Sequence, residues 1–435
     1  MKANYRMLTI ALALSIPLLS QAETAEGVAA YKSKQYEKAA TELLAPAEAG
    51  DAEAMVYMGF LYFNGRGGIA KDEVKAFDFY RKAAEKKFPR ALNEIGWIYA
   101  NGRSGVANDE NEAKSWYKKG ADLGDPDAIA NLGYFSETGK AGTKDIAAAI
   151  KLYQQAAGLE NSFAMMRLGR LYAEGLEVEQ DIKQAAEWYR KSGELGNRYA
   201  QNSLGELYLN GKGIQQDLVQ ATAWWKKAAD QNLASAQAHL GNAYIFGNGV
   251  EKDEKQGVAL YRKAVAQNDP LGQLYLGEAY YRGKAGLPKD SAKSAELFAK
   301  SAAQGNANAQ LSLGVFYHNG IGVGKDTKQA ALWYSKAAEQ GLAGAQNNIG
   351  YLYSVGEGVE KDPKQAAIWY AKAAEQGFSE SQVHLGFAYA GGVGVERNDA
   401  LAMSWYRKAA AQGNEYAKKN IRAMVDAGRG DGMAP

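Results

Sequence analysis

The sequence contains no cysteine, and its 435 residues include only three histidines. Without cysteine there is no disulfide, no thiol nucleophile and no residue that could carry a lipid at a processing site. His239 and His384 lie far apart along the chain, and His318 stands near a predicted loop, so the three do not have the spacing of metal ligands. We therefore expect no metal site and no cofactor.

The sequence also lacks an excess of charge of either sign. Lys and Arg number 51 and Asp and Glu 49, which gives a formal net charge of +2. A nearly neutral chain has no electrostatic footprint for nucleic acid or for anionic lipid. We expect neither as a partner.

Long apolar runs are scarce. The longest, Met7 to Leu19, has 13 residues, whereas a spanning helix needs about 20. It follows the basic residues Lys2 and Arg6 and precedes the small residues Ser20 and Ala22, as in an export signal. We expect residues 1–22 to be cleaved after Ala22, which leaves a periplasmic or secreted chain with no membrane insertion. An uncleaved membrane anchor is the alternative.

Glycine is abundant, and ten glycines stand inside predicted helices at intervals of 36 or 37 residues: Gly59, Gly96, Gly133, Gly169, Gly205, Gly241, Gly277, Gly314, Gly350 and Gly386. Glycine in a helix interior costs about 1 kcal/mol relative to alanine, so a packing requirement must maintain it. We predict that each glycine lets a neighbouring helix or aromatic ring approach closely. A period of this length indicates a repeat array rather than separate globular domains.

The stretch from Asn306 to Gly341 illustrates one repeat. Apolar residues at helical spacing predict a first helix after Asn306 and a second after Asp326, with glycine-rich turns between and after them. Loops such as Asn210 to Gly213 superficially resemble phosphate-binding glycine runs, but they follow helices rather than strands, which favours structural turns.

Helix-capping residues recur at the start of each predicted second helix. The caps are Asp72, Asp109, Asp145, Asp181, Asp217, Asp253, Asp290, Asp326, Asp362 and Asn398, and the expected capping-box partners three residues on are Glu112, Gln184, Gln220, Gln256, Gln329 and Gln365. Pro89, Pro126, Pro270 and Pro363 all fall at predicted first helical positions. Periodic aspartate therefore indicates capping rather than calcium binding, because no clustered acidic neighbours accompany it.

The pattern Ala-Gln-x-x-Leu-Gly-x-x-Tyr, a Gly-x-Gly-Val loop, Asp-x-x-Lys/Gln-Ala and Trp-Tyr-x-Lys-Ala-Ala resembles the Sel-one-like repeat family, relatives of tetratricopeptide repeats. The segments from Ala309 to Gly341 and from Ala345 to Gly377 match almost position by position. The resemblance implies an all-α fold, a right-handed superhelical solenoid of about ten helix-turn-helix repeats, that serves as a scaffold for other proteins. A cysteine-rich branch of the family is associated with β-lactam binding, but this chain has no cysteine and no matching serine motif.

The expected organisation is an export signal over residues 1–22, an N-terminal capping helix pair over 23–49 that is broken near Pro46, ten repeats over 50–413, a C-terminal capping helix over 414–428 and a flexible tail over 429–435. Atypical end units keep a repeat array soluble.

Function is expected at positions that vary between repeats. The residue after each mid-helix glycine varies, and related superhelices place this helix on the concave side. The candidate partner-binding residues are Phe60, Trp97, Tyr134, Arg170, Glu206, Glu278, Tyr351 and Phe387. Aromatic residues with charged neighbours are typical of protein interfaces. The alternative is that these rings pack against the next repeat.

We therefore expect a non-catalytic scaffold of the bacterial envelope that binds a protein or peptide along a groove. The alternatives are a surface-exposed or secreted binder of host proteins, or a regulator of envelope signalling. An enzyme of cell-wall or β-lactam chemistry is a further alternative. It finds little support because neither a Gly-x-Ser-x-Gly nor a His-Glu-x-x-His motif is present.

Overall fold

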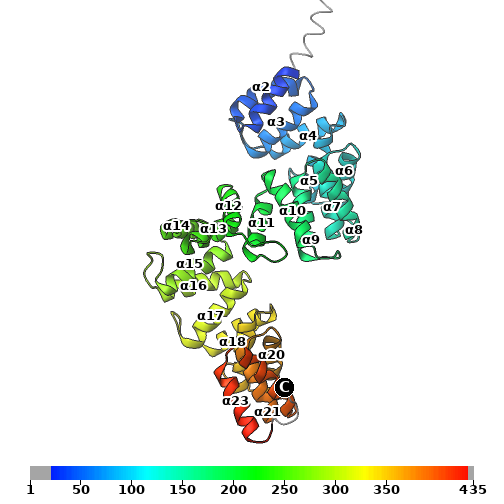
Figure 1. Ribbon diagram of the computed structural model, residues 1–435. Coiled ribbons are helices and arrows are strands. Elements are labelled where there is room, and N and C mark those ends of the chain that lie inside the picture. Colours follow the sequence, from blue (N-terminus) through cyan, green and yellow to red (C-terminus); the bar gives the residue numbers. More distant parts are fainter. Residues whose placement is uncertain (1–20, 430–435) are drawn as a thin grey trace, which may run out of the picture. The chain divides into compact units, whose positions relative to one another are not determined.

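The computed structural model describes residues 21–429, and this part of the chain folds into helices and turns without a strand. Of the expected export signal, residues 1–20 lie outside the described part, as do residues 430–435 of the expected tail. The helices fall into two compact units, one ending at Gln216 and the other beginning at Asp217, and each is described by itself (Figure 1). The predicted all-α fold is confirmed.

The first unit contains helical residues 21–32, a helix α2 and then helix pairs. In each pair the first helix (helix A) packs against the second (helix B). The helices are α2 (Tyr36–Glu48), α3 (Ala52–Asn64), α4 (Glu73–Glu85), α5 (Pro89–Asn101), α6 (Glu110–Asp122), α7 (Pro126–Thr138), α8 (Ile146–Gly158), α9 (Ser162–Glu174), α10 (Ile182–Glu194) and α11 (Arg198–Asn210).

The second unit opens on a helix B, continues with five helix pairs and closes with one further helix. Its helices are α12 (Leu218–Asp230), α13 (Ala234–Phe246), α14 (Glu254–Ala266), α15 (Pro270–Arg282), α16 (Ser291–Ala303), α17 (Ala307–Asn319), α18 (Thr327–Glu339), α19 (Ala343–Val355), α20 (Pro363–Glu375), α21 (Ser379–Gly391), α22 (Asp399–Ala411) and α23 (Glu415–Asp426).

The mid-helix glycines allow contact with the aromatic ring of the paired helix B, as predicted. A Cβ atom on Gly314 would lie 2.6 Å from Cδ1 of Tyr334, which is 1% exposed. The same relation, at 3.0 Å or less, joins glycine and ring in nine repeats: Gly59 with Tyr80, Gly96 with Tyr117, Gly133 with Tyr153, Gly169 with Tyr189, Gly241 with Tyr261, Gly277 with Phe298, Gly314 with Tyr334, Gly350 with Tyr370, and Gly386 with Tyr406. The ring occupies the volume that any side chain would need.

The residue before this ring, usually tryptophan, is less buried than the ring itself. Trp116 and Trp333 are partly exposed. The ammonium group of the lysine three residues later lies over each indole, with Lys119 Nζ 3.9 Å from the Trp116 ring centroid and Lys336 Nζ 4.3 Å from that of Trp333. The tyrosine therefore provides the core contact, and the tryptophan covers the outer side of helix B.

The predicted N-caps of helix B are all confirmed. Asp326, for example, accepts hydrogen bonds from the backbone N–H groups of Lys328 and Gln329. Asn398 caps α22 in the same way, through the N–H of Leu401. The predicted prolines also stand at the first turn of their helices: Pro89, Pro126, Pro270 and Pro363.

The second half of the predicted capping box is wrong. The backbone N–H of Asp326 donates to the carbonyl oxygen of Tyr317 at 2.9 Å, so Gln329 finds no free donor there. The N–H of the cap residue donates to the equivalent helix-A carbonyl in the repeats that contain Glu112, Gln184, Gln256 and Gln365. The donor at the start of helix B is thus satisfied by the tertiary pairing of helices A and B, not locally.

A left-handed residue follows the end of helix B. Gly341 has φ +90° and Gly377 has φ +87°, and Asn232 and Asn268 both have φ +59°. The second glycine of the loop after helix A serves a different purpose. At Gly322 a Cβ would overlap the carbonyl group of Ser291, the first residue of the preceding helix B. This close backbone approach accounts for the loop glycines without a phosphate.

A ladder of buried glutamines links the repeats of the second unit. Gln310 is 4% exposed, and its side-chain amide donates to the carbonyl of Ala302 in the preceding helix B at 3.1 Å. Its own oxygen accepts from Gln340, at the end of the paired helix B, at 2.8 Å. The same side-chain pairs recur 30 or 31 residues apart, as Gln237 with Gln267, Gln273 with Gln304, Gln346 with Gln376, and Gln382 with Gln412. Both polar groups of each buried amide are satisfied.

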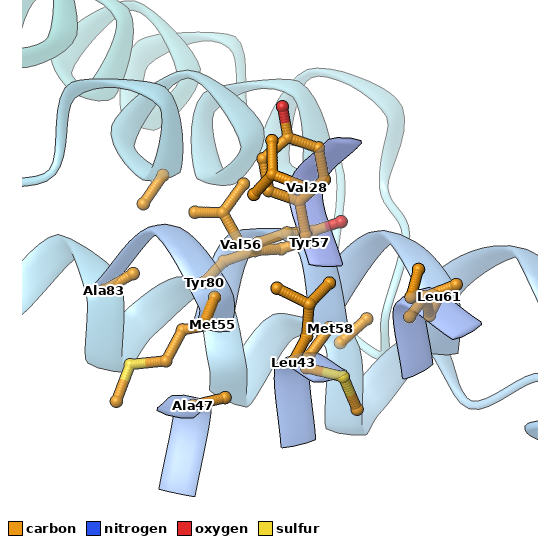
Figure 2. Close-up of a cluster of buried hydrophobic side chains, with 14 of the residues drawn as sticks. Val28, Leu43, Ala47, Met55, Val56, Tyr57, Met58, Leu61, Tyr80 and Ala83 are labelled. Atoms are coloured by element: carbon orange, nitrogen blue, oxygen red, sulfur yellow. The ribbon is translucent and has the colours of Figure 1, made fainter. Parts of the chain in front are cut away.

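The N-terminal end of the first unit is closed by a cluster of apolar side chains. Figure 2 shows Val28 from the first described helix and Leu43 from α2 against Met58 and Leu61 of α3. The predicted break near Pro46 is wrong, because α2 continues through that proline to Glu48. Pro46 lies in the last turn of the helix, where only a short stretch of the helix follows it.

We predict that Gly314→Ala destabilises the protein by about 1–3 kcal/mol, although alanine favours helix, because the added methyl overpacks against Tyr334. Gly344→Ala is the matched control: it lies in helix α19, where the nearest atom, Leu311 Cδ2, is 3.5 Å from the new Cβ. Urea unfolding followed by circular dichroism measures both. Equal midpoints for the two variants would contradict the proposed packing role.

Candidate functional site

The candidate site is the set of residues that directly follow the mid-helix glycines, here named the helix-A row. Three of its aromatic members are exposed: Trp97 by 38%, Tyr351 by 39% and Phe387 by 63%. The other candidates are partly buried: Phe60, Tyr134, Arg170, Glu206 and Glu278. The structure therefore divides the predicted set into three exposed aromatic side chains and five partly buried side chains.

In the first unit, Phe60 is covered by neighbouring rings and by a cation. The ring centroid of Tyr31 lies 5.9 Å from that of Phe60, and Tyr80 lies at 5.8 Å. The Arg90 guanidinium lies 5.2 Å from the Phe60 centroid. Phe60 thus serves mainly as packing between the N-terminal segment and the first repeat.

The next two row members differ from each other. Tyr134 packs edge-on to Phe163 at 6.3 Å and carries the Arg167 guanidinium at 5.1 Å from its centroid. Trp97 packs edge-on to Phe63 with ring centroids 5.6 Å apart, and no cation within residues 21–429 lies over its ring. Trp97 is therefore the row aromatic of the first unit that is open to a partner.

Arg170 belongs to a buried ion-pair cluster around Glu137, whose side chain is 4% exposed. Arg170 Nη2 donates to Glu137 Oε1 at 2.6 Å, Arg167 Nε donates to Oε2 at 2.8 Å, and the Tyr153 hydroxyl donates to Oε2 at 2.7 Å. Burial alone would raise the pKa of Glu137, but the hydrogen bonds from Arg167 and Tyr153 outweigh it and lower that pKa. Both oxygens of Glu137 are thus engaged by members of the cluster, whereas Arg170 Nε is buried without a hydrogen-bond partner among residues 21–429.

Glu94, one helical turn before Trp97, has the opposite environment. It accepts a hydrogen bond from Asn93 Nδ2 at 3.2 Å. Burial raises its pKa to about 7, the nearby Arg90 guanidinium opposes this rise, and Asp127 and Asp125 add to it. Glu94 is therefore a carboxylate whose burial outweighs the attraction of Arg90.

The remaining charged candidates have local partners. Glu206 accepts a hydrogen bond from Asn202 Nδ2 at 2.8 Å on the same helix. Burial raises the pKa of Glu278, and Arg282 on the same helix opposes this effect. Glu206 also acts electrostatically on Tyr189 of α10, and Glu278 on Tyr261 of α14.

In the second unit, Tyr351 and Phe387 line a cavity of about 370 Å³ between α19, α20 and α21. His384 lies within it, stacked on Tyr370 with centroids 4.7 Å apart and planes at 21°. Burial lowers the pKa of His384 despite the opposing charge of Glu380. Phe387 also borders a second hollow of about 240 Å³ beside Met424 of α23.

The sequence analysis did not identify Glu94, Glu137 or His384 as site residues. Glu94 and His384 share one register position, two residues before the mid-helix glycine, which differs in chemistry from repeat to repeat. That variation within a regular repeat was the sequence signal that could have marked Glu94 and His384 as candidate site residues. It could not show which of these side chains has a partner, because the partners come from neighbouring helices.

The described residues hold no group of three or more His, Asp or Glu side chains placed to bind a metal ion. Within the same residues, each helix is too short or too polar to span a bilayer. His239, whose position matches that of His384, stacks on Trp225 with centroids 4.9 Å apart.

Comparison with known proteins agrees with the helix pairs. The sequence profile of the Sel1 repeat matches ten consecutive segments, residues 52–88, 89–125, 126–161, 162–197, 198–233, 234–269, 270–306, 307–342, 343–378 and 379–414. No functionally curated protein sequence matched the chain.

Two solved structures are similar over most of their length. The crystal structure of c5321, described as a protective antigen present in uropathogenic Escherichia coli strains with an SLR fold, is 34% identical, with 89% of this chain and 90% of that chain covered and a TM-score of 0.52. A Sel1 repeat protein from Oxalobacter formigenes is 32% identical, with 71% of this chain and 90% of that chain covered and a TM-score of 0.50.

We predict that Glu94→Gln raises the melting temperature at pH 8 but not at pH 4. The pKa of Glu94 is raised to about 7 in the folded state, from an ordinary value of 4.5. The Glu94 carboxyl therefore loses its proton less readily in the folded state than in the unfolded state. The folded state is destabilised relative to the unfolded state as the pH rises from about 4.5 through 7. Thermal melts at both pH values test this, with the exposed Glu187→Gln on α10 as control. An equal shift at pH 4 and pH 8 would refute the assignment.

Proposed function

The chain belongs to the Sel1 repeat family, whose members are generally protein-interaction scaffolds, and from this premise we propose that it binds a protein or peptide through the helix-A row. The family is typically non-catalytic, and we propose the same for this chain. The row differs in chemistry from repeat to repeat, while the glycines, the rings and the caps recur.

The exposure of large aromatic side chains carries this proposal. Phe387 is 63% exposed at the edge of the cavity that Tyr351 also lines. Full burial of such a side chain yields about 1.5–3 kcal/mol, so a ring left in water forgoes stabilisation that a partner can recover. Exposed aromatic residues beside a cavity are what protein-interaction surfaces use as anchors.

The buried polar cluster of the first unit favours a scaffold over an enzyme. Glu137 is a deeply enclosed carboxylate near the row, and its oxygens accept from Arg167, Arg170 and Tyr153. A general base must keep a lone pair available for substrate, whereas this carboxylate is charge-neutralised and has a lowered pKa. Its chemistry supports structural linkage between successive repeats.

We further propose that the protein is exported, as a scaffold of the bacterial envelope. The support is the sequence of residues 1–22, with a basic start, an apolar stretch of 13 residues and small residues before Glu23. The second candidate is a surface-exposed or secreted protein that binds host proteins. It is favoured by one observation, the 34% identity to an E. coli protein described as a protective antigen.

Export predicts a defined processing product. Expressed in a Gram-negative host, the full chain should yield an envelope or secreted fraction whose N-terminal residue is Glu23, measured by N-terminal sequencing and intact mass. Replacing Leu12 with Arg inside the apolar stretch should retain the unprocessed chain in the cell, because the signal then loses its apolar core. An unprocessed N-terminus on the exported wild-type chain would contradict cleavage after Ala22.

Binding through the row predicts position-dependent crosslinking. A benzophenone amino acid at Phe387 should give a discrete protein adduct in intact cells on illumination. The same group at Ile368, which is 47% exposed on helix B, is the matched control and should give none. Tyr351→Ala should remove the adduct at position 387 while helical content stays unchanged. Equal adducts from positions 387 and 368 would count against the helix-A row as the binding surface.

A further inference from the structure

The cavity of about 370 Å³ in the second unit combines apolar walls with one charged side chain. Its walls come from α19, α20, α21 and the turns beside them, and they include the rings of Tyr351, Tyr370 and Phe387. Ligand pockets in proteins usually have volumes of about 300–1,000 Å³. The structure therefore offers a site of ordinary ligand-pocket size at two successive members of the helix-A row.

Two of the aromatic rings at this cavity are left partly in water. Phe387 is 63% exposed and Tyr351 is 39% exposed, whereas Tyr370 is buried. Aromatic pairs gain stabilisation from edge-to-face or offset-stacked contacts in addition to the area they remove from water. An aromatic side chain that enters the cavity therefore fits its lining better than an aliphatic side chain does.

The aromatic side chains of the cavity are supported by neighbouring groups. On the side of the preceding repeat, the ring centroid of His318 lies 6.3 Å from that of Tyr351, and His318 Nε2 lies 3.3 Å from Glu357 Oε2. His384 also lines the cavity and stacks on Tyr370 with centroids 4.7 Å apart. Groups that are ordered before a partner arrives lower the entropic cost of binding.

The charge in the cavity is that of Lys361, and no acid is among the described residues that line it. Lys361 directly precedes Asp362, the N-cap of α20. At the same position of three other repeats the basic residue pairs with an acid two residues further on: Lys71 with Glu73 at 2.9 Å, Lys252 with Glu254 at 2.7 Å, and Arg397 with Asp399 at 3.1 Å. In this repeat the residue two positions on is Pro363, so Lys361 lacks the local acid.

The other titratable groups near the cavity leave Lys361 as its cation. Glu357 contacts His318, and Glu380, in the first turn of α21, acts electrostatically on His384. Burial lowers the pKa of His384, so its imidazole is neutral at pH 8 and offers one N–H donor. A carboxylate on the ligand is therefore complementary to this lining.

We propose that this cavity is the recognition site for an acidic–aromatic segment of a protein partner, in which an aromatic side chain stands next to an aspartate or glutamate. The aromatic side chain packs on Tyr351 and Phe387, and the neighbouring carboxylate pairs with Lys361. This rests on the proposed function and deepens it, because it gives the chemistry of one anchor on the partner.

Three capped dipeptides serve as probes: N-acetyl-Phe-Asp-amide, its uncharged analogue N-acetyl-Phe-Asn-amide and its aliphatic analogue N-acetyl-Leu-Asp-amide. The purified protein is labelled with ¹⁵N in histidine, and its imidazole signals are followed by NMR at pH 8. Of the three histidines, His384 lines the cavity, whereas His239 stacks on Trp225. Titration with the Phe-Asp probe should shift the signals of His384 and leave those of His239 unchanged.

The three probes should differ in affinity. The Phe-Asp probe should bind about fivefold more tightly than the Phe-Asn probe, which is the upper range for one solvent-exposed ion pair. This preference should fall as salt is added, because added ions screen the pair. The Leu-Asp probe should bind about threefold more weakly than the Phe-Asp probe, because it lacks the aromatic contacts.

Variants assign these differences to the cavity. Lys361→Gln should abolish the preference for the Phe-Asp over the Phe-Asn probe. Lys325→Gln changes the equivalent lysine of the preceding repeat and should leave the preference unchanged, as the matched control. Phe387→Ala, at an exposed position, should weaken the binding of all three probes, whereas Ile368→Ala, exposed on helix B, should not.

The outcomes separate this proposal from the proposed function. Equal binding of the Phe-Asp and Phe-Asn probes would overturn the acidic anchor, as would a preference that persists in Lys361→Gln. Absence of a His384 shift with every probe at millimolar concentration would overturn the site itself. In each of these cases a protein adduct from position 387 in cells would still support the proposed function.

Two further results bear on the occupant. The expected probe preferences without a cellular adduct from position 387 would support the ligand chemistry of the cavity and count against the proposed function. A crosslink from position 387 that joins two copies of the purified protein would make a second copy of this chain the occupant, and would overturn the acidic–aromatic segment of another protein.

Discussion

The contact between the mid-helix glycine of helix A and the aromatic ring of helix B is the constraint on which the rest of the structure depends. A ring such as Tyr334 lies against the helix backbone at Gly314 because no Cβ separates them. The distance between the two helices is set by this contact. The carbonyl of Tyr317, three residues beyond the glycine, is thereby brought to the N–H of the cap Asp326.

The same constraint explains why binding chemistry is confined to few positions. On α17 Gly314 faces the ring of Tyr334, and the side chain of Gln310 donates to the carbonyl of Ala302 in the preceding helix B. The residue after the glycine varies from repeat to repeat. Phe60 packs on Tyr31, Arg170 donates a hydrogen bond to Glu137, and Phe387 is exposed to solvent.

Electrostatics differ between neighbouring repeats although the backbone does not. Glu137 receives hydrogen bonds from two guanidinium groups of α9, and its pKa falls, whereas burial raises the pKa of Glu94 and Asp127 and Asp125 from the start of α7 add to that rise. The following repeat contributes arginines beside Glu137 and aspartates beside Glu94. A regular array can therefore vary its surface chemistry from one repeat to the next without altering its packing.

The sequence by itself determined the helix pairs, the caps and the location of the aromatic contacts, because these depend on residues that recur at constant spacing. It misjudged the capping box at Gln329 and the end of α2 at Pro46, where a tertiary hydrogen bond and a helix terminus decide the outcome. It named the row but could not separate Trp97 from Phe60 and Tyr134. Only the tertiary structure decided that, because the side chains that cover or neutralise a row residue come from helices about 30 residues further along the chain, and their contacts leave no periodic trace in the sequence.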